Sequence, residues 1–265
     1  MLKYGIISTF YHNDLDVYAG TRAAPDRLPA HNRYFYDVWA DFINIFLGPD
    51  VPVIIVNNAS PVNPENFYGH FPNFEIIGNT NKMMVQGTRR AHTFNFNSAL
   101  CRGLQMLKEK GIKYGAHIEQ DLLVKGKEWL PKCIKKMKRS NADIMGFSLT
   151  DLNRFATELF ITDVDFWLEN QLLSLEPYFH CVEFLSSEVI LKAQLKKIKV
   201  NILDWVEMDS TRDLHPDPAG VNGVKYAHHR NPDEMIAFLE QSGIKSNNIN
   251  RLKEFIKRKC LLPYN

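Results

Sequence analysis

The feature that most constrains the fold is an alternation of short apolar runs with amphipathic stretches over the first 150 residues. The apolar runs end in polar or turn residues, as buried strands do, and they lie at 3–11, 51–56, 74–77, 114–118 and 142–149. Between them, apolar residues recur at helical spacing, which predicts helices over 33–47, 93–110 and about 130–139. Such a pattern predicts an α/β fold, with a mixed, mostly parallel sheet flanked by helices on both faces.

The remaining chain has a different rhythm, with shorter elements and a long loop rich in Pro, Asp and Gly at 209–223. Strands are expected at 159–162, 200–208 and 224–229, and helices from Asp163 or Asp165, at 186–199, after Asn231 and from Lys245. We find no internal repeat, low-complexity tract or dividing linker. A single domain over residues 1–265 is therefore expected.

Composition excludes several classes of protein. The 32 basic residues nearly balance the 30 acidic ones, which disfavours a nucleic-acid binder, and 45% hydrophobic residues exclude a disordered chain. The sequence shows neither a secretory signal nor an apolar stretch long enough to span a membrane. Widely spaced cysteines without a Cys-x-x-Cys pair indicate reduced thiols. A soluble, cytoplasmic protein is expected.

Polar residues follow several predicted strands, at the edge where ligands bind to open α/β sheets. They are Thr9 to His12, Asn57 to Ser60, Asn79 to Asn81 and Glu119 to Asp121. The last group is an acid-x-acid tripeptide, whose carboxylates could hold a divalent cation. The alternative is a pair of surface acids at a strand exit.

Histidines near the end of the chain are a second candidate for metal binding. His228 and His229 lie at the end of a predicted strand, and imidazole is a good ligand for Mn2+. The alternative is two ordinary histidines before a helix. His215, in the loop, is less well placed.

Four segments in this order resemble the GT-A-fold glycosyltransferases, in particular the small nucleotide-sugar-dependent enzymes that build polysaccharides. They are Ser8-Thr9-Phe10-Tyr11, Asn57-Asn58-Ala59-Ser60, Asn97-Ser98-Ala99-Leu100 and Ala116-His117-Ile118-Glu119-Gln120-Asp121. The resemblance implies a Rossmann-related GT-A-like domain that moves a sugar from a nucleotide donor to a saccharide or other hydroxyl. It also implies a donor-binding half at 1–125, an acceptor-side half at 126–230 and a helical tail at 231–265.

The resemblance implies roles for individual residues. Mn2+ or Mg2+ would be held by Asp121 and Glu119, with His228 or His229 completing the shell. The nucleotide sugar would lie against polar and aromatic side chains after the strands: Thr9, Tyr11 or Phe10, Asn57, Asn79, Glu119, and Arg89 or Arg90 before the helix. The two arginines could equally be surface charges.

Two positions depart from the family pattern. Asn57 stands where a base-reading Asp is expected, and an amide donates as well as accepts hydrogen bonds. The donor is therefore left open among UDP-, GDP- and TDP-linked sugars. The metal motif is Glu-Gln-Asp instead of Asp-x-Asp, but both ends remain acidic.

An inverting enzyme also needs a base that takes the proton of the acceptor hydroxyl. Glu183 is the first candidate, and Asp151 and Asp209 compete with it. Glu183 could also be a first-turn residue of the helix that follows. Whether the reaction inverts or retains configuration is left open.

Other functions fit parts of the sequence. A nucleotidyltransferase would carry a Gly-rich loop after the first strand, which this chain lacks. A metal-dependent hydrolase on His215, His228 and His229 has no helical ligand pair to support it. A non-catalytic carbohydrate- or nucleotide-binding protein on the same scaffold is the third alternative. The basic tail from Lys245 indicates either peripheral attachment to an anionic surface or a solvated helix face.

Overall fold

A seven-stranded sheet is the centre of the protein in this computed structural model, which describes residues 3–10, 33–79, 89–120, 122–149, 154–172, 185–204, 225–228 and 232–260. The strand order is β3-β2-β1-β4-β7-β6-β8. The strands are β1 (Tyr4–Phe10), β2 (Val53–Asn57), β3 (Phe74–Gly78), β4 (Tyr114–Ile118), β6 (Ile144–Leu149), β7 (Arg154–Asp163) and β8 (Ile202–Asp204). Only β7 runs antiparallel to its neighbours, β4 and β6, so the predicted mixed, mostly parallel sheet is confirmed.

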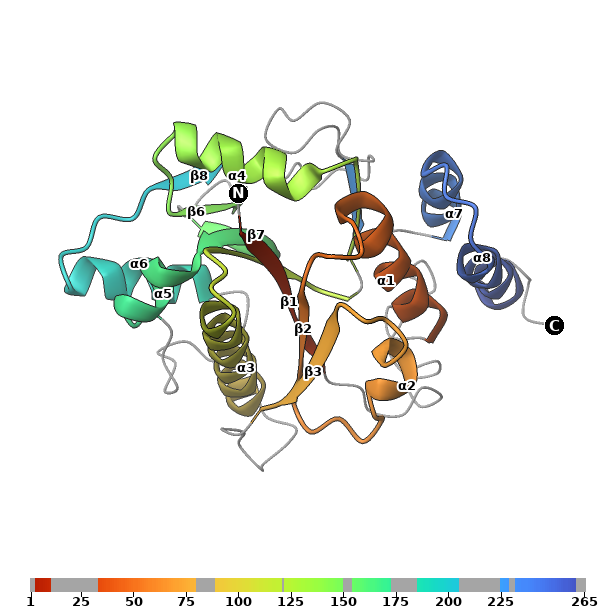
Figure 1. The fold of residues 1–265 in the computed structure, drawn as a ribbon, viewed down its shortest axis with the longest axis horizontal. Helices are drawn as coiled ribbons and strands as arrows, with labels where there is room; N and C mark the ends of the chain where they lie inside the picture. The colour runs from red at the N-terminus through yellow and green to blue at the C-terminus, as the bar shows by residue number, and fades with distance from the viewer. Residues whose placement is uncertain are drawn as a thin grey trace.

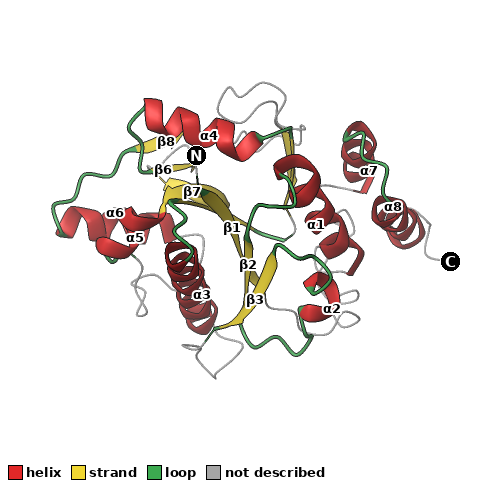
Figure 2. Cartoon of the chain, viewed as in Figure 1, coloured by secondary structure: helices red, strands yellow, loops and turns green. Residues whose placement is uncertain are grey.

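Helices cover both faces of this sheet (Figures 1 and 2). One layer contains α3 (Arg89–Glu109), α5 (Val164–Glu169) and α6 (Leu185–Leu195). The other contains α1 (Arg33–Leu47), α2 (Glu65–Tyr68) and α4 (Trp129–Arg139), with α7 (Pro232–Gln241) and α8 (Asn247–Cys260) packed outside α1. The predicted two-sided covering is therefore confirmed.

Burial on both faces explains why the strands are continuous apolar runs. Successive residues of β1 point to opposite faces: Ile6 packs in the α1 layer and Ile7 in the α3 layer, and both are buried. A polar residue at either position would be buried away from water, so apolar residues occupy both faces of β1. The sequence of this strand therefore lacks an alternation of polar and apolar residues, and only the length of the apolar run indicates a strand.

An aromatic cluster fills the space between β1, α1 and α2. Phe10, Tyr36, Phe67 and Tyr68 have ring centroids 5.1–6.3 Å apart, and each is almost completely buried. Of the two aromatic candidates for contact with the nucleotide, Tyr11 and Phe10, the ring of Phe10 is thus part of the core. The short helix α2 had no periodic signal in the sequence.

The chain after β4 differs from the sequence prediction. The sequence predicted no strand between Ile118 and the helix near residue 130, whereas β5 (Leu122–Lys125) lies there and pairs antiparallel with β9 (Lys225–His228) in a second, two-stranded sheet. The four residues of β5 are buried, since they pack in the α1 layer.

The α3 helix also begins earlier than expected. Its first residue is Arg89, so Arg89 and Arg90 lie in the first helical turn and not in a loop before the helix. The start at Thr93 was predicted from the position of the apolar stripe along the sequence. The first residues of the helix do not belong to that stripe, so the sequence did not reveal them.

The C-terminal helices are attached to α1 by both apolar and polar contacts. Tyr34 and Phe255 have ring centroids 5.4 Å apart, and the Ser246 hydroxyl donates to Asp41 Oδ2 at 2.5 Å. Ile256 is buried against this layer, whereas Arg258 is exposed. In the part of α8 that the structure describes, the basic residues thus form the solvated side of a packed helix.

Two further findings concern membranes and cysteines. No helix within the described ranges combines the length and apolar character needed to cross a bilayer.

Cys101 and Cys133 are free thiols, as expected for these two. Burial raises the pKa of the Cys101 thiol, which makes it a poor nucleophile at neutral pH.

Close packing of α3 on β1 generates a prediction about stability. A Cβ atom at Gly103 would lie 2.5 Å from Ile7 Cγ2, so Gly103→Ala must displace the helix or the strand. Overpacking costs about 1–3 kcal/mol, which exceeds the gain of about 1 kcal/mol from replacing a helical glycine by alanine. We expect urea denaturation to show a net loss on the order of 1 kcal/mol in the free energy of unfolding. Gly78→Ala, which meets nothing within 4 Å, is the control. Equal stability of the two variants would contradict this packing.

Candidate functional site

The carboxyl ends of the parallel strands meet at one edge of the sheet, toward the bottom of the view in Figure 1. The register pairs Thr9 with Val56, Phe10 with Asn57, and Asn57 with Gly78. Thr9, Asn57 and Asn79 therefore lie along this edge, as the order of the strands requires. The structure brings these three predicted residues together.

A buried hydrogen-bond network joins this edge to the first half of α3. Asn79 Nδ2 donates to Asn58 Oδ1 at 2.7 Å and to the Asn95 carbonyl at 3.3 Å, and the Ser98 hydroxyl donates to Asn79 Oδ1 at 2.8 Å. Asn79 is only 5% exposed. Both ends of its amide are thus used within the protein, so the structure gives Asn79 a positioning role at this edge.

Asn57 is oriented by a turn in its own loop. Its Oδ1 atom accepts a hydrogen bond from the Ser60 backbone N–H at 2.8 Å, which fixes the amide and directs its Nδ2 group elsewhere. The side chain is half-buried. A ligand at Asn57 would therefore meet a hydrogen-bond donor, whereas an aspartate would offer only acceptors.

The end of β4 is held on both sides by neighbouring strands. The Ser8 hydroxyl donates to the Ile118 carbonyl at 2.7 Å, and the Glu119 N–H donates to the Glu158 carbonyl of β7 at 2.9 Å. Leu122 N–H donates to the Glu119 carbonyl at 3.1 Å, which closes a turn between β4 and β5. Backbone hydrogen bonds therefore fix the chain on both sides of the acid-x-acid motif.

The second sheet brings a distant part of the chain to this turn. In the β5–β9 pairing, Leu122 lies opposite His228. Leu122 directly follows Asp121, so the strand that ends at His228 runs beside the exit of the acid-x-acid motif. The sequence predicted both segments as metal ligands but contained no signal that they would pair.

Several candidate residues lie outside the described residues: Tyr11, Asp121, Asp151, Glu183, Asp209, His215 and His229. Within the described ranges, no three His, Cys, Asp or Glu side chains gather as a metal site. Glu119, which is described, is half-buried at the end of β4. Its carboxylate is the kind of hard oxygen ligand that Mn2+ and Mg2+ prefer.

Sequence reasoning missed Glu158. The predicted strand began at Leu159, since only the apolar residues of β7 were detectable, whereas β7 begins at Arg154. The polar residues of β7 run along the end of β4: the Thr157 carbonyl lies 2.8 Å from His117 Nδ1. Residues 154–158 read polar, apolar, apolar, polar, polar, so no alternation in the sequence marked the longer strand.

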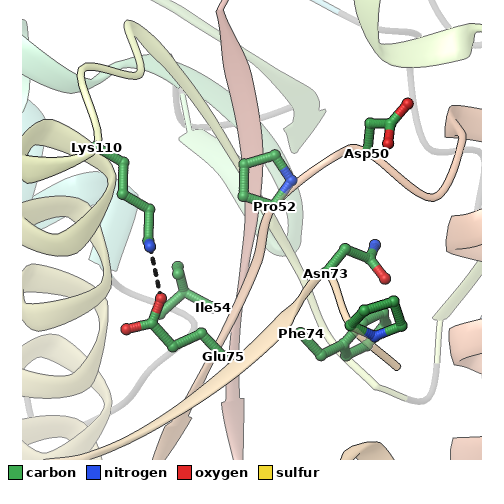
Figure 3. Close-up of a pocket in the computed structure, with 8 residues that line it drawn as sticks. Asp50, Pro52, Ile54, Asn73, Phe74, Glu75 and Lys110 are labelled. Atoms are coloured by element: carbon green, nitrogen blue, oxygen red, sulfur yellow. Dashed lines mark ion pairs between the residues drawn. The ribbon is translucent and has the colours of Figure 1, made fainter. Parts of the chain in front are cut away.

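A pocket lies away from this edge, at the amino ends of β2 and β3 (Figure 3). Its volume is about 180 Å³ and its lining includes Pro52, Asn73, Glu75 and Lys110. Lys110 Nζ and Glu75 Oε2 form an ion pair of 2.7 Å on one side of it. Ligand pockets are usually about 300–1,000 Å³, so this hollow is too small for a nucleotide sugar.

No protein-family model matches the sequence, and no curated protein does. The structure, in contrast, is similar to solved ones. A protein from Desulfovibrio desulfuricans G20, assigned to the nucleotide-diphospho-sugar transferases, has 11% identity and a TM-score of 0.50, over 98% of this chain and 99% of that one. At this identity the likeness is one of fold, and it confirms the predicted GT-A-like fold.

Two other structures are similar at lower scores. S. aureus TarS 1–349 in complex with UDP-GlcNAc has 9% identity and a TM-score of 0.49, over 97% of this chain and 72% of that one. A cytidylyltransferase from Leptospira borgpetersenii serovar Hardjo-bovis has 10% identity and a TM-score of 0.47, over 97% of this chain and 95% of that one.

The asparagine network generates a second prediction. Asn79→Ala removes the partner of the buried Asn58 side-chain oxygen, Oδ1, and of the Ser98 hydroxyl. We therefore expect a loss of about 2 kcal/mol or more in the free energy of unfolding. Urea denaturation measures this loss. Asn79→Asp should be comparably destabilised, since a carboxylate cannot donate to Asn58 Oδ1.

The matched control is Asn63→Ala, which removes an exposed Asn whose Oδ1 accepts from Glu65 N–H. We expect a loss below about 1 kcal/mol there. If Asn79→Ala were no less stable than Asn63→Ala, the network would not hold the edge of the sheet together.

Proposed function

We propose that this protein is a glycosyltransferase, which moves a sugar from a nucleotide-diphosphate donor to a hydroxyl of a saccharide or related acceptor. The observation that carries the proposal is the arrangement at the β4 exit. Glu119 directly follows β4, Asp121 comes two residues later in the sequence, and the β5–β9 register sets the backbone of His228 opposite Leu122. On this ground we assign the acid-x-acid motif and His228 to one metal site.

The proposed cation fits this donor set. Asp121 and Glu119 supply carboxylate oxygens, and His228 or His229 would add an imidazole nitrogen, a combination suited to Mn2+ and also acceptable to Mg2+. A divalent cation there would offset the negative charge that develops on the leaving nucleoside diphosphate. All of these metal ligands, Glu119 included, are part of the proposal.

The start of α3 supports the placement of the diphosphate. Ser98 and the Asn95 carbonyl tie this helix to the edge where β3 ends. Helix N-termini attract phosphate groups through unpaired backbone N–H groups and the helix dipole. Arg89 and Arg90 add positive charge to the first turn of α3, where an anion would compensate them.

The donor base would lie near the ends of β1 and β2. Thr9 and Asn57 occupy adjacent strands there, and Tyr11 follows β1 directly. Because Asn57 presents an amide donor, we propose that it binds an acceptor atom of the base, whichever of uracil, guanine or thymine the donor carries. Asn79 contributes by holding this edge in place.

The chemistry then needs a base on the acceptor side if configuration is inverted. The bond between the sugar anomeric carbon and the diphosphate oxygen breaks, the acceptor oxygen bonds to that carbon, and the acceptor proton passes to a carboxylate. Glu183 is our first candidate for this carboxylate, with Asp151 and Asp209 as alternatives. A retaining reaction would not require it.

The test is release of nucleoside diphosphate from UDP-, GDP- and TDP-sugars, with and without Mn2+. We expect one donor class to be hydrolysed slowly in the presence of metal, and Asp121→Asn to reduce that rate about tenfold or more, since a charged ligand is removed. Asp50→Asn, an exposed acid at the other edge of the sheet, should leave the rate unchanged.

Three results would contradict the proposal in different ways. Equal rates for Asp121→Asn and the unmodified protein would remove the metal assignment. Release of inorganic pyrophosphate from a nucleoside triphosphate and a sugar phosphate, with no release of nucleoside diphosphate from any nucleotide sugar, would identify a nucleotidyltransferase. Metal-dependent binding of a nucleotide sugar, without release in the presence of any acceptor saccharide, would indicate a binding protein.

A further inference from the structure

The outward side of α4 carries a concentration of positive charge. The inward side of the helix is apolar and buried. The exposed residues of the helix are all basic, and we call them the α4 basic face: Lys132, Lys135, Lys138 and Arg139. No acidic residue occurs anywhere in α4, although the whole chain has 30 acidic residues for its 32 basic ones. The charge is therefore a local feature of this helix.

Basic residues on other helices have acidic partners. Lys108 Nζ of α3 lies 2.9 Å from Asp165 Oδ1, and Lys253 Nζ of α8 lies 2.8 Å from Glu240 Oε1. Among the residues that the structure describes, no ion pair involves a member of the α4 basic face. Its positive charge is thus not offset in the way seen on α3 and α8.

The stability of α4 does not account for this charge. Cations near a helix C-terminus are favourable, which explains Lys138 and Arg139 in the last turn. Lys132 and Lys135 lie before that turn, three residues apart, and Lys135 lies four residues before Arg139. Like charges at these spacings repel each other on a helix surface. The α4 basic face therefore contains a repulsion that an anionic partner would relieve.

The positive surface continues to the amino edge of the sheet. The Nζ atoms of Lys138 and Lys113 lie 5.7 and 5.9 Å from the centre of the Tyr114 ring. Lys113 N–H donates to the Lys3 carbonyl at 3.2 Å, and both lysines are exposed. Asp163 offsets the charge of Lys113, since its Oδ2 atom lies 3.4 Å from Lys113 Nζ. Lysines from three separate segments thus lie at one end of the molecule.

The chemistry of this surface favours a lipid bilayer over a nucleic acid. The exposed residues of α4 include no aromatic side chain on which a base could stack. Three of the four are lysines, which act as point charges, whereas the planar fork of arginine suits bidentate recognition of one phosphate. The apolar side of α4 is part of the core, so it is not available for insertion among acyl chains. Electrostatic attraction to anionic headgroups is the interaction that this face can make.

We propose that the α4 basic face binds the anionic headgroups of a membrane surface. In Figure 1, α4 lies at the top of the view and the carboxyl edge of the sheet toward the bottom. Binding through α4 therefore leaves the carboxyl edge turned away from the bilayer. The inference is independent of the proposed function, because it uses none of the residues assigned to that site.

The experiment is sedimentation of the unmodified protein with vesicles of phosphatidylcholine alone, or with about 30% phosphatidylglycerol added. We expect binding to the anionic vesicles only, and a loss of at least about tenfold between about 0.05 and about 0.5 M NaCl, because salt screens the headgroup charge. The test variant is Lys132→Gln/Lys135→Gln/Arg139→Gln. It should bind at least about tenfold more weakly, since each basic residue near an anionic bilayer strengthens binding about fivefold.

The matched control removes the same charge from three exposed positions of α8: Arg251→Gln/Lys257→Gln/Arg258→Gln. It has the same net charge as the α4 variant, and its binding should change less than about twofold. Thermal unfolding without vesicles is a second readout. The α4 variant should unfold at the same temperature as the unmodified protein or at a higher one, because repulsion is removed. Its weaker binding would then not be due to unfolding.

Three results would overturn the inference. Equal losses in the two triple variants would assign the attraction to net charge instead of α4. Equal binding to neutral and anionic vesicles, or binding to neither at about 0.05 M NaCl, would exclude an electrostatic membrane contact. Tighter binding to a DNA duplex than to anionic vesicles at the same salt concentration would identify a nucleic acid as the partner. None of these results affects the release of nucleoside diphosphate, which tests the proposed function.

Discussion

The antiparallel pairing of β7 with β4 is the constraint on which the candidate site depends. Every other neighbour of β1, β2 and β4 in the sheet is parallel, so these strands alone would bring only their own carboxyl ends to the edge. Because β7 enters from that edge, residues 158–160 run alongside residues 117–119. Residues from the start of β7 therefore lie at the same edge as the carboxyl end of β4.

The same edge is stabilised by polar groups that a ligand does not need to contact. Asn79, Asn58 and Ser98 use buried side-chain hydrogen bonds to tie β2, β3 and α3 together, and Ser8 ties β1 to β4. On the far side of the acid-x-acid motif, β5 is held by β9 and buried under α1. Such a division, with some polar residues positioning the edge and others left for the ligand, allows a site to be rigid before a substrate binds.

The sequence was sufficient for the elements whose pattern is local. Apolar runs marked β1 and β4, and the stripe of Phe35, Val38, Trp39, Phe42 and Phe46 marked α1 with the bounds that the structure shows. The sequence was insufficient to predict elements that form through contacts between distant segments. One example is β5, a strand of four residues that pairs with β9, about a hundred residues later in the chain. At the site, strand order correctly placed Thr9, Asn57 and Asn79 at one edge. It could not reveal that Asn79 is fully engaged by its neighbours, that the Phe10 ring is part of the core, or that Glu158 lies opposite Glu119, because those depend on packing between distant segments.

The central claim is that a nucleotide sugar binds at the carboxyl edge of the sheet. Hydrogen–deuterium exchange of the backbone amides, with UDP, GDP or TDP and Mn2+ added to the unmodified protein, tests the location directly. We expect one of the three diphosphates to slow exchange at residues 57–60, 118–122 and the start of α3, and to leave the amino edge around Asp50 and Lys110 unchanged. Protection confined to that amino edge, or an exchange pattern that none of the three diphosphates alters, would contradict the account.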